Sequence, residues 1–133
     1  MKILLDTNVF LWAAGIDGNL SETATAILRD PDVPIVISAV TAWEIAIKWS
    51  KGRLTLPEKP VELIRHVISA AGLLQLPVTL EDACKVAELA RYHNDPFDRL
   101  LVVQAQSNGL SLMTADPELE RYEVDVVLCK QNK

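Results

Sequence analysis

The sequence predicts an α/β fold, in which a central parallel β-sheet of four to five short strands is flanked by helices on both faces. Short aliphatic runs alternate with helical patterns along the chain, an order of elements typical of a parallel sheet. The runs are apolar throughout, as strands covered on both faces are. Because the chain has 133 residues and half of them are hydrophobic, we expect a single domain over residues 1–133.

Capping residues and helix breakers mark the elements in the first half of the chain. Ser21 precedes one helical pattern and Asp30-Pro31 ends it, while Gly52 and Gly72 follow two others. We therefore expect, in order, a strand at 3–5, a helix over 9–13 capped by Thr7 or Asn8, a helix from Ser21 to about Leu28, a strand at 35–37 ending at Ser38, a helix from Ala39 to about Ser50, and a helix from Val61 to Gly72.

The second half of the chain repeats this alternation. Asp95 is a natural N-cap because Pro96 suits the first position of a helix, and Asp98 then falls in the first turn. We expect, in order, a short strand at 73–76, a helix from Thr79 to about Tyr92, a helix from Asp95-Pro96 to Asn108-Gly109, a strand at 110–113, a helical turn at Asp116-Pro117, and a last strand at 124–128.

Composition excludes several classes of protein. No apolar run approaches the roughly 20 residues that span a bilayer, and the apolar run before Asp6 is too short for a signal peptide, so we expect a cytoplasmic protein without a membrane partner. The net charge of −5 argues against bulk electrostatic binding of nucleic acid. Cys84 and Cys129 lack zinc-site spacing and are expected to be buried or inert thiols.

Four acidic residues stand where the predicted sheet ends. Asp6 and Asp116 each follow a strand, Glu44 lies one turn into the helix after the second strand, and Asp98 opens a helix near the same edge. The carboxyl ends of parallel strands meet at one edge, so the four carboxylates are expected to share one crevice.

The position of Asp98 on its helix favours a functional role. Leu101, Val102 and Ala105 lie three, four and seven residues on, so Asp98 is on the apolar face, whereas Arg99 and Gln104 are expected to lie largely elsewhere. A carboxylate aimed at a core is costly unless it is paired, hydrogen-bonded or bound to a metal.

Each acid also has a structural alternative. Asp6 and Asp116 could only cap helix starts, and Glu44 could only pair with Lys48 four residues on. However, four carboxylates in one crevice repel one another, and hard divalent ions relieve that repulsion. The pattern therefore predicts one or two Mg²⁺ or Mn²⁺ ions, which activate water in phosphodiester hydrolysis.

These segments together resemble the PIN domain, most closely the VapC-type toxins of toxin–antitoxin pairs. The resemblance covers essentially the whole chain. The segments that support it are ILLDTNVFLW, ISAVTAWEIAIKWSKGRL, HNDPFDRLLVVQAQ and LSLMTADPEL.

The resemblance implies a metal-dependent endoribonuclease that cleaves RNA, held inactive by a cognate antitoxin, and usually dimeric. The catalytic and metal-binding residues it implies are Asp6, Glu44, Asp98 and Asp116, with Asp95 the nearest alternative to Asp98. Asn8 and Thr114 would orient Asp6 and Asp116, although helix capping and turn formation explain them equally well. By analogy, the antitoxin would lay a helix in an apolar groove between the early helices and insert a basic side chain among the acids.

Several residues keep more than one interpretation. Trp12 and Trp43 are expected in the core, while Trp49 is left open between core and partner groove. Basic residues suited to an RNA backbone, or merely solvated, are Lys48, Lys51, Arg53, Arg91, His93 and Arg99. The alternative functions are a non-catalytic binding module of the same fold and a haloacid-dehalogenase-like phosphatase, which would need an acid where Asn8 stands.

Overall fold

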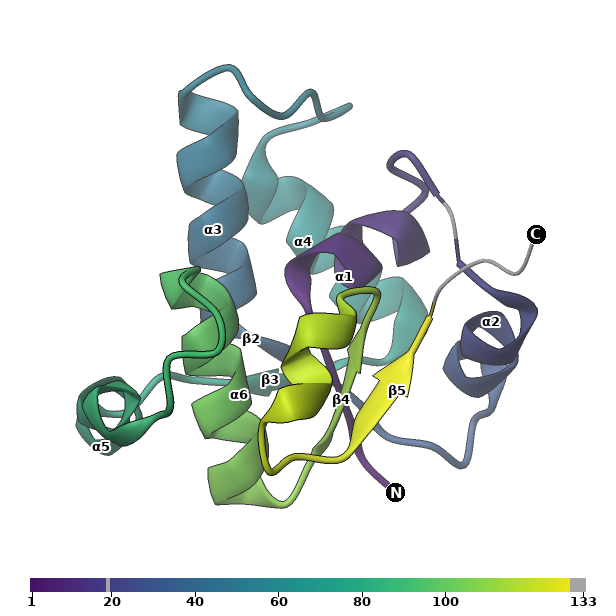
Figure 1. The fold of residues 1–133 in the computed structure, drawn as a ribbon. Coiled ribbons are helices and arrows are strands. Elements are labelled where there is room, and N and C mark those ends of the chain that lie inside the picture. The colour runs from purple at the N-terminus through teal and green to yellow at the C-terminus, as the bar shows by residue number, and fades with distance from the viewer. Residues whose placement is uncertain (19, 130–133) are drawn as a thin grey trace.

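Strand β1 (Ile3–Leu5) lies at the centre of a five-stranded sheet in the computed structural model, which describes residues 1–18 and 20–129 (Figure 1). The strand order is β3-β2-β1-β4-β5, and every neighbouring pair is parallel. The other strands are β2 (Ile35–Ser38), β3 (Leu74–Leu76), β4 (Ser111–Thr114) and β5 (Val126–Leu128). The predicted parallel α/β fold is confirmed.

The order of the strands places a topological switch point beside β1. The chain moves outward from β1 to β2 and β3, and then returns to the other side of β1 to form β4 and β5. Leu4 is therefore in register with Val36 on one side and Leu112 on the other. In open α/β sheets, ligands bind in the crevice outside the strand ends at such a point.

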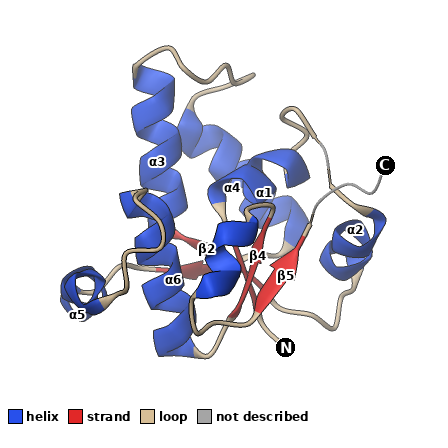
Figure 2. Cartoon of the chain, viewed as in Figure 1, coloured by secondary structure: helices blue, strands red, loops and turns tan. Residues whose placement is uncertain are grey.

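Helices cover both faces of the sheet (Figure 2). Ile3 and Leu5 face a core built with α1 (Thr7–Ala13), α2 (Glu22–Arg29) and α4 (Pro60–Ala71). Leu4 points to the opposite face, where it meets a second core built with α6 (Pro96–Asn108). Between them, α3 (Ala39–Ser50) contributes Ile45 to the first core and Val40 to the second.

Most helix starts follow the predicted caps, with one correction. The side chain of Asp95 accepts the N–H groups of Phe97 and Asp98 at 2.8 and 3.2 Å, as expected at the start of α6. The cap of α1, however, is Asp6, whose Oδ1 accepts the N–H of Val9 at 2.8 Å, and the helix already begins at Thr7. A cap at Thr7 or Asn8 was therefore wrong and the alternative of a cap at Asp6 is confirmed, because no residue separates the end of β1 from the cap.

The predicted helix from Thr79 to Tyr92 is too long. α5 ends at Lys85, a 3₁₀ turn η1 (Val86–Glu88) follows, and the chain then runs irregularly to Asp95. Buried Arg99 explains the early end, because its guanidinium takes the carbonyls that a longer helix would use. It donates to the carbonyls of Val86, Leu89, Ala90 and His93 at 2.9 to 3.3 Å.

Burial of α6 extends beyond its apolar face to polar residues on other sides of the helix. Arg99 is only 6% exposed and Gln104 is fully buried, so the expectation that both lie away from the core was wrong. The amide nitrogen of Gln104 donates to the carbonyl of Pro77 at 3.0 Å and to Asp82 at 3.2 Å, while its oxygen accepts from Ser38. Hydrogen bonds, not apolar contact, thus bury this side of α6.

Three further expectations depend on burial. Trp12 is partly buried against the core, but Trp43 is 57% exposed, so placing Trp43 in the core was wrong; it packs edge-on against Phe97 on the outer side of α3. Trp49 is 40% exposed. Cys129 is buried as expected, whereas Cys84 lies on the exposed side of α5.

Among the described residues, no helix is long and apolar enough to cross a bilayer.

Replacing Arg99 tests whether it organises residues 86–95. We expect Arg99→Ala to lower the free energy of unfolding by about 3 kcal/mol, because buried carbonyls lose their donors. Arg99→Lys should recover only part of the loss, since an ammonium cannot reproduce the planar fork. Urea unfolding measures both, with exposed Arg53→Ala as the control, expected within about 0.5 kcal/mol of wild type. Equal effects at both arginines would contradict this.

Candidate functional site

Four acidic side chains gather at the carboxyl edge of the sheet. Asp6 directly follows β1, Glu44 lies in the second turn of α3, Asp98 in the first turn of α6, and Asp116 two residues beyond β4. Their charges act on one another: Glu44 and Asp116 raise the pKa of Asp6, while Asp6 and Glu44 raise that of Asp98. The structure therefore brings together the four carboxylates singled out from the sequence.

Asp6 is the most buried of the three aspartates in the cluster, at 5% exposure. Its Oδ1 accepts the N–H of Val9, and its Oδ2 accepts the Thr114 hydroxyl at 2.5 Å. Burial raises the pKa of Asp6 to about 6, against the lowering effect of these two hydrogen bonds. The carboxylate is fixed in position but costly to ionise.

Thr114 joins the ends of β1 and β4. Its hydroxyl donates to Asp6 and accepts the N–H of Asp116 at 3.1 Å. The sequence pointed to Thr114 as a partner of Asp116 only, and the structure adds Asp6. Asn8, in contrast, is exposed, and no hydrogen bond among the described residues joins it to Asp6, whose two oxygens accept from Val9 and Thr114.

Glu44 is held from two sides. Thr7 donates to its Oε1 at 2.6 Å, and Lys48 donates to its Oε2 at 2.5 Å. The pair with Lys48 was predicted from the spacing of four residues. Thr7 was missed, since it is 37 residues away and the sequence marked it only as a possible helix cap.

Asp98 lies at the border between core and solvent, with its side chain 21% exposed. Its pKa is raised to about 7, mainly by burial and further by the charges of Asp95, Asp6 and Glu44, against the lowering effect of His93. Near neutral pH the Asp98 carboxyl is therefore divided between its protonated and ionised forms. A nearby cation would favour the ionised form.

Asp116 combines two roles that the sequence offered as alternatives. Its Oδ1 accepts the N–H of Glu118 at 2.9 Å and so caps the 3₁₀ helix η2 (Pro117–Arg121). Its Oδ2 faces the acidic cluster, where it lies 2.8 Å from Nε2 of His93. Capping thus fixes this carboxylate without removing it from the site.

His93 is the residue of the site that the sequence did not reveal. Its Nε2 lies 2.8 Å from Asp116 and 3.6 Å from Asp98, and the three side chains offer donor atoms within 4.8 Å of one another. It was predicted as a basic residue for an RNA backbone. Its sequence position carries no helical or metal-site spacing, because it lies in the irregular segment shaped by Arg99.

The donor set fits a hard divalent cation. Among the described residues, salt bridges to these four carboxylates come only from Lys48 and His93. Negative charge therefore exceeds positive charge in a partly buried place. Burial is the main cause of the raised pKa values of Asp6 and Asp98, and repulsion by the neighbouring carboxylates adds to it. Carboxylate oxygens are the ligands that Mg²⁺ and Mn²⁺ prefer.

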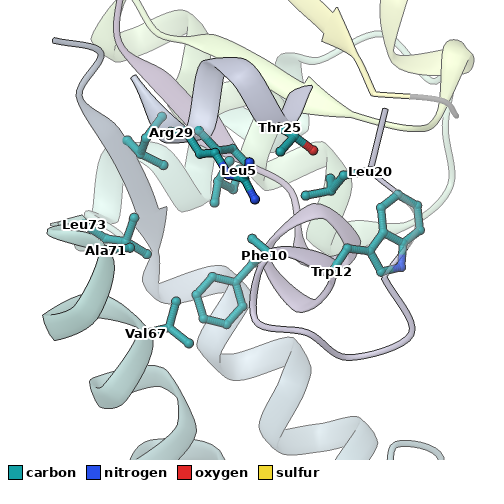
Figure 3. Close-up of a pocket in the computed structure, with 12 residues that line it drawn as sticks. Leu5, Phe10, Trp12, Leu20, Thr25, Arg29, Val67, Ala71 and Leu73 are labelled. Atoms are coloured by element: carbon teal, nitrogen blue, oxygen red, sulfur yellow. The ribbon is translucent and has the colours of Figure 1, made fainter. Parts of the chain in front are cut away.

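A hollow lies away from the acidic cluster, between α1, α2 and α4 (Figure 3). Its lining is mainly apolar and includes Phe10, Trp12 and Val67, with Arg29 as the charged member. It lies where the sequence predicted an apolar groove between the early helices.

The sheet order and the carboxylates at its switch point define an α/β protein with an acidic cluster at the carboxyl edge of its sheet. The model of the PIN domain matches residues 3–125, so the chain belongs to the PIN domain family. A search of curated proteins found no significant match.

Solved structures share the fold over nearly the whole chain. VapBC2 from Rickettsia felis, bound to a DNA fragment from its promoter, gives a TM-score of 0.74 at 16% identity and covers 98% of this chain and 100% of that one. DNA-bound VapBC from Salmonella typhimurium gives a TM-score of 0.66 at 23% identity and covers 96% of this chain and 97% of that one. A toxin–antitoxin complex from Klebsiella pneumoniae gives a TM-score of 0.66 at 18% identity and covers 98% of this chain and 99% of that one.

The raised pKa of Asp98 predicts how stability depends on pH. Asp98 ionises near 3.8 when unfolded and near 7 when folded, so between these values the folded chain binds more protons. In the presence of a chelator, its contribution to the free energy of unfolding should therefore fall as pH rises from about 4 to 7. Asp98→Asn should make the pH profile flatter over this window.

Chemical unfolding at a series of pH values measures this difference. Asp32→Asn, at an exposed turn between α2 and β2, provides the control and should retain the wild-type slope. A profile for Asp98→Asn as steep as that of wild type would contradict the assignment.

Proposed function

We propose that the protein is a metal-dependent endoribonuclease and the toxin of a toxin–antitoxin pair. The observation that carries the proposal is the convergence of Asp6, Glu44, Asp98 and Asp116 at the switch point of a PIN fold. Membership of the family and the likeness to VapBC complexes support it.

The four carboxylates would hold one or two Mg²⁺ or Mn²⁺ ions. Bound there, the metal supplies a water of lowered pKa and stabilises the leaving oxygen of a phosphodiester. Thr114 and Thr7 hold Asp6 and Glu44 in place through their hydroxyl groups. Near neutral pH part of the Asp98 population is protonated, and this part would lose its proton when a cation binds, so uptake of metal would release protons.

Binding of RNA falls to the basic residues that the fold leaves free. Lys48 is paired with Glu44, and Arg99 is buried among carbonyls, which leaves neither for the substrate. Lys51, Arg53 and Arg91 are exposed and are proposed to contact the phosphate backbone.

We propose that an antitoxin docks in the hollow between α1, α2 and α4. The apolar side chains of Phe10 and Trp12 would receive an apolar helix face, and a basic side chain of the antitoxin would reach the acidic cluster. The VapBC and toxin–antitoxin complexes that share the fold support a protein partner. A homodimer and a cytoplasmic location remain predictions.

Cleavage assays test the proposal. We expect Asp6→Asn and Asp98→Asn to lower cleavage of RNA by at least 100-fold and to relieve growth arrest in cells, because each removes a metal-binding charge. Asp95→Asn is the matched control: asparagine caps a helix as well as aspartate, so cleavage should remain within a few-fold of wild type.

Circular dichroism must show that all three variants fold. Undiminished cleavage in the Asp6 and Asp98 variants would overturn the proposal, as would loss of cleavage confined to Asp95→Asn.

Calorimetry with Mn²⁺ separates the nuclease from a non-catalytic binding module. A nuclease site should take up one or two ions per chain, and Asp98→Asn should abolish or strongly weaken uptake; acids that only cap helices predict no specific uptake. A phosphatase of the haloacid-dehalogenase kind is disfavoured because exposed Asn8 stands where that chemistry needs an acid. Trapping an aspartyl-phosphate on Asp6 would revive it.

A further inference from the structure

The backbone of His93 is anchored independently of its side chain. Its N–H donates to the hydroxyl of Tyr122 at 2.9 Å, and its carbonyl accepts from Arg99 at 3.3 Å. The imidazole therefore projects from a fixed point toward Asp98 and Asp116. A smaller side chain at position 93 should leave the path of residues 90–95 intact.

The two ring nitrogens have different partners. Nδ1 lies 3.0 Å from the backbone N–H of Asp95 and accepts its proton, so Nδ1 itself carries none. In the neutral ring the proton is then on Nε2, which donates to Oδ2 of Asp116 at 2.8 Å. The N–H of Asp95 thus selects the tautomer.

This tautomer argues against His93 as a direct metal ligand. A ligating Nε2 would need its lone pair free and the proton on Nδ1, where it would oppose the N–H of Asp95. As a donor, the imidazole instead holds Oδ2 of Asp116, while the N–H of Glu118 holds Oδ1. Two donors fix the plane of the carboxylate, and each oxygen retains a second lone pair.

We propose that His93 is a positioning residue of the metal site, which holds the Asp116 carboxylate through Nε2–H so that Asp116 and Asp98 bind one cation together. The inference rests on the proposed metal-dependent function. Nε2 is also 3.6 Å from Asp98, so the imidazole lies close to both carboxylates. Groups that orient metal-binding side chains in this way typically contribute 10- to 100-fold to metal affinity.

Mn²⁺ calorimetry on the full chain at pH 7.5 tests the donor role. We expect His93→Ala to weaken binding about 10- to 100-fold, because Asp116 loses one of its two donors. His93→Gln should restore affinity to within a few-fold, since its amide can place an N–H near the position of Nε2. His66→Ala, at an exposed histidine that pairs with Glu58, is the matched control and should bind as wild type does.

Nitrogen-15 NMR of labelled histidine reports the tautomer of the His93 ring, which a purely structural role would not determine. The proposal expects the Nε2–H tautomer for His93 both before and after saturation with diamagnetic Mg²⁺. A direct ligand would change to the Nδ1–H form when Mg²⁺ is added.

The outcomes separate this inference from the proposed function. If Asp98→Asn loses Mn²⁺ but His93→Ala binds as tightly as wild type or more tightly, only the role of His93 is overturned. A tautomer change on Mg²⁺ addition, or failure of His93→Gln to restore affinity in a folded protein, overturns it as well. A wild-type protein that takes up no Mn²⁺ overturns the metal-dependent function and this inference together.

Discussion

The parallel pairing of β1 with β4 is the constraint on which the site depends. It brings the first residue after β1 next to the end of β4, where the N–H of Asp6 donates to the carbonyl of Met113 at 3.0 Å. Only in that arrangement can one hydroxyl, that of Thr114, bond both Asp6 and the backbone of Asp116. Residues 108 positions apart thus become neighbours because two short strands lie side by side.

This pairing concentrates negative charge where water is scarce. Burial alone disfavours the ionised forms of Asp6 and Asp98, and their mutual repulsion adds to the cost. At Asp6, hydrogen bonds from the Thr114 hydroxyl and the N–H of Val9 offset part of this cost. The remainder is a local loss of stability, which is expected where a protein preserves a binding site at the expense of its fold.

How much the sequence could predict depended on whether the signal was local. Asp95-Pro96 marked the start of α6 correctly because capping needs only neighbouring residues. Asp6 and Asp116 could be placed at one edge because strand ends can be located from apolar runs, and Asp98 could be singled out by its place on the apolar face of its helix. Arg99, His93 and Trp43 were misjudged because their surroundings come from other segments. Arg99 is buried by carbonyls 6 to 13 residues away, which no helical periodicity encodes.

The start of α6 shows how a few adjacent residues combine separate tasks. Asp95 caps the helix and selects the His93 tautomer through its N–H, Asp98 enters the acidic cluster, and Arg99 fixes the segment that carries His93. Because these residues share one helical turn, the segment before α6 cannot move relative to Asp98 without breaking hydrogen bonds to Arg99. The neutral carbonyls around Arg99 therefore serve the site indirectly, because they tie the position of the imidazole relative to the Asp98 carboxylate to the start of one helix.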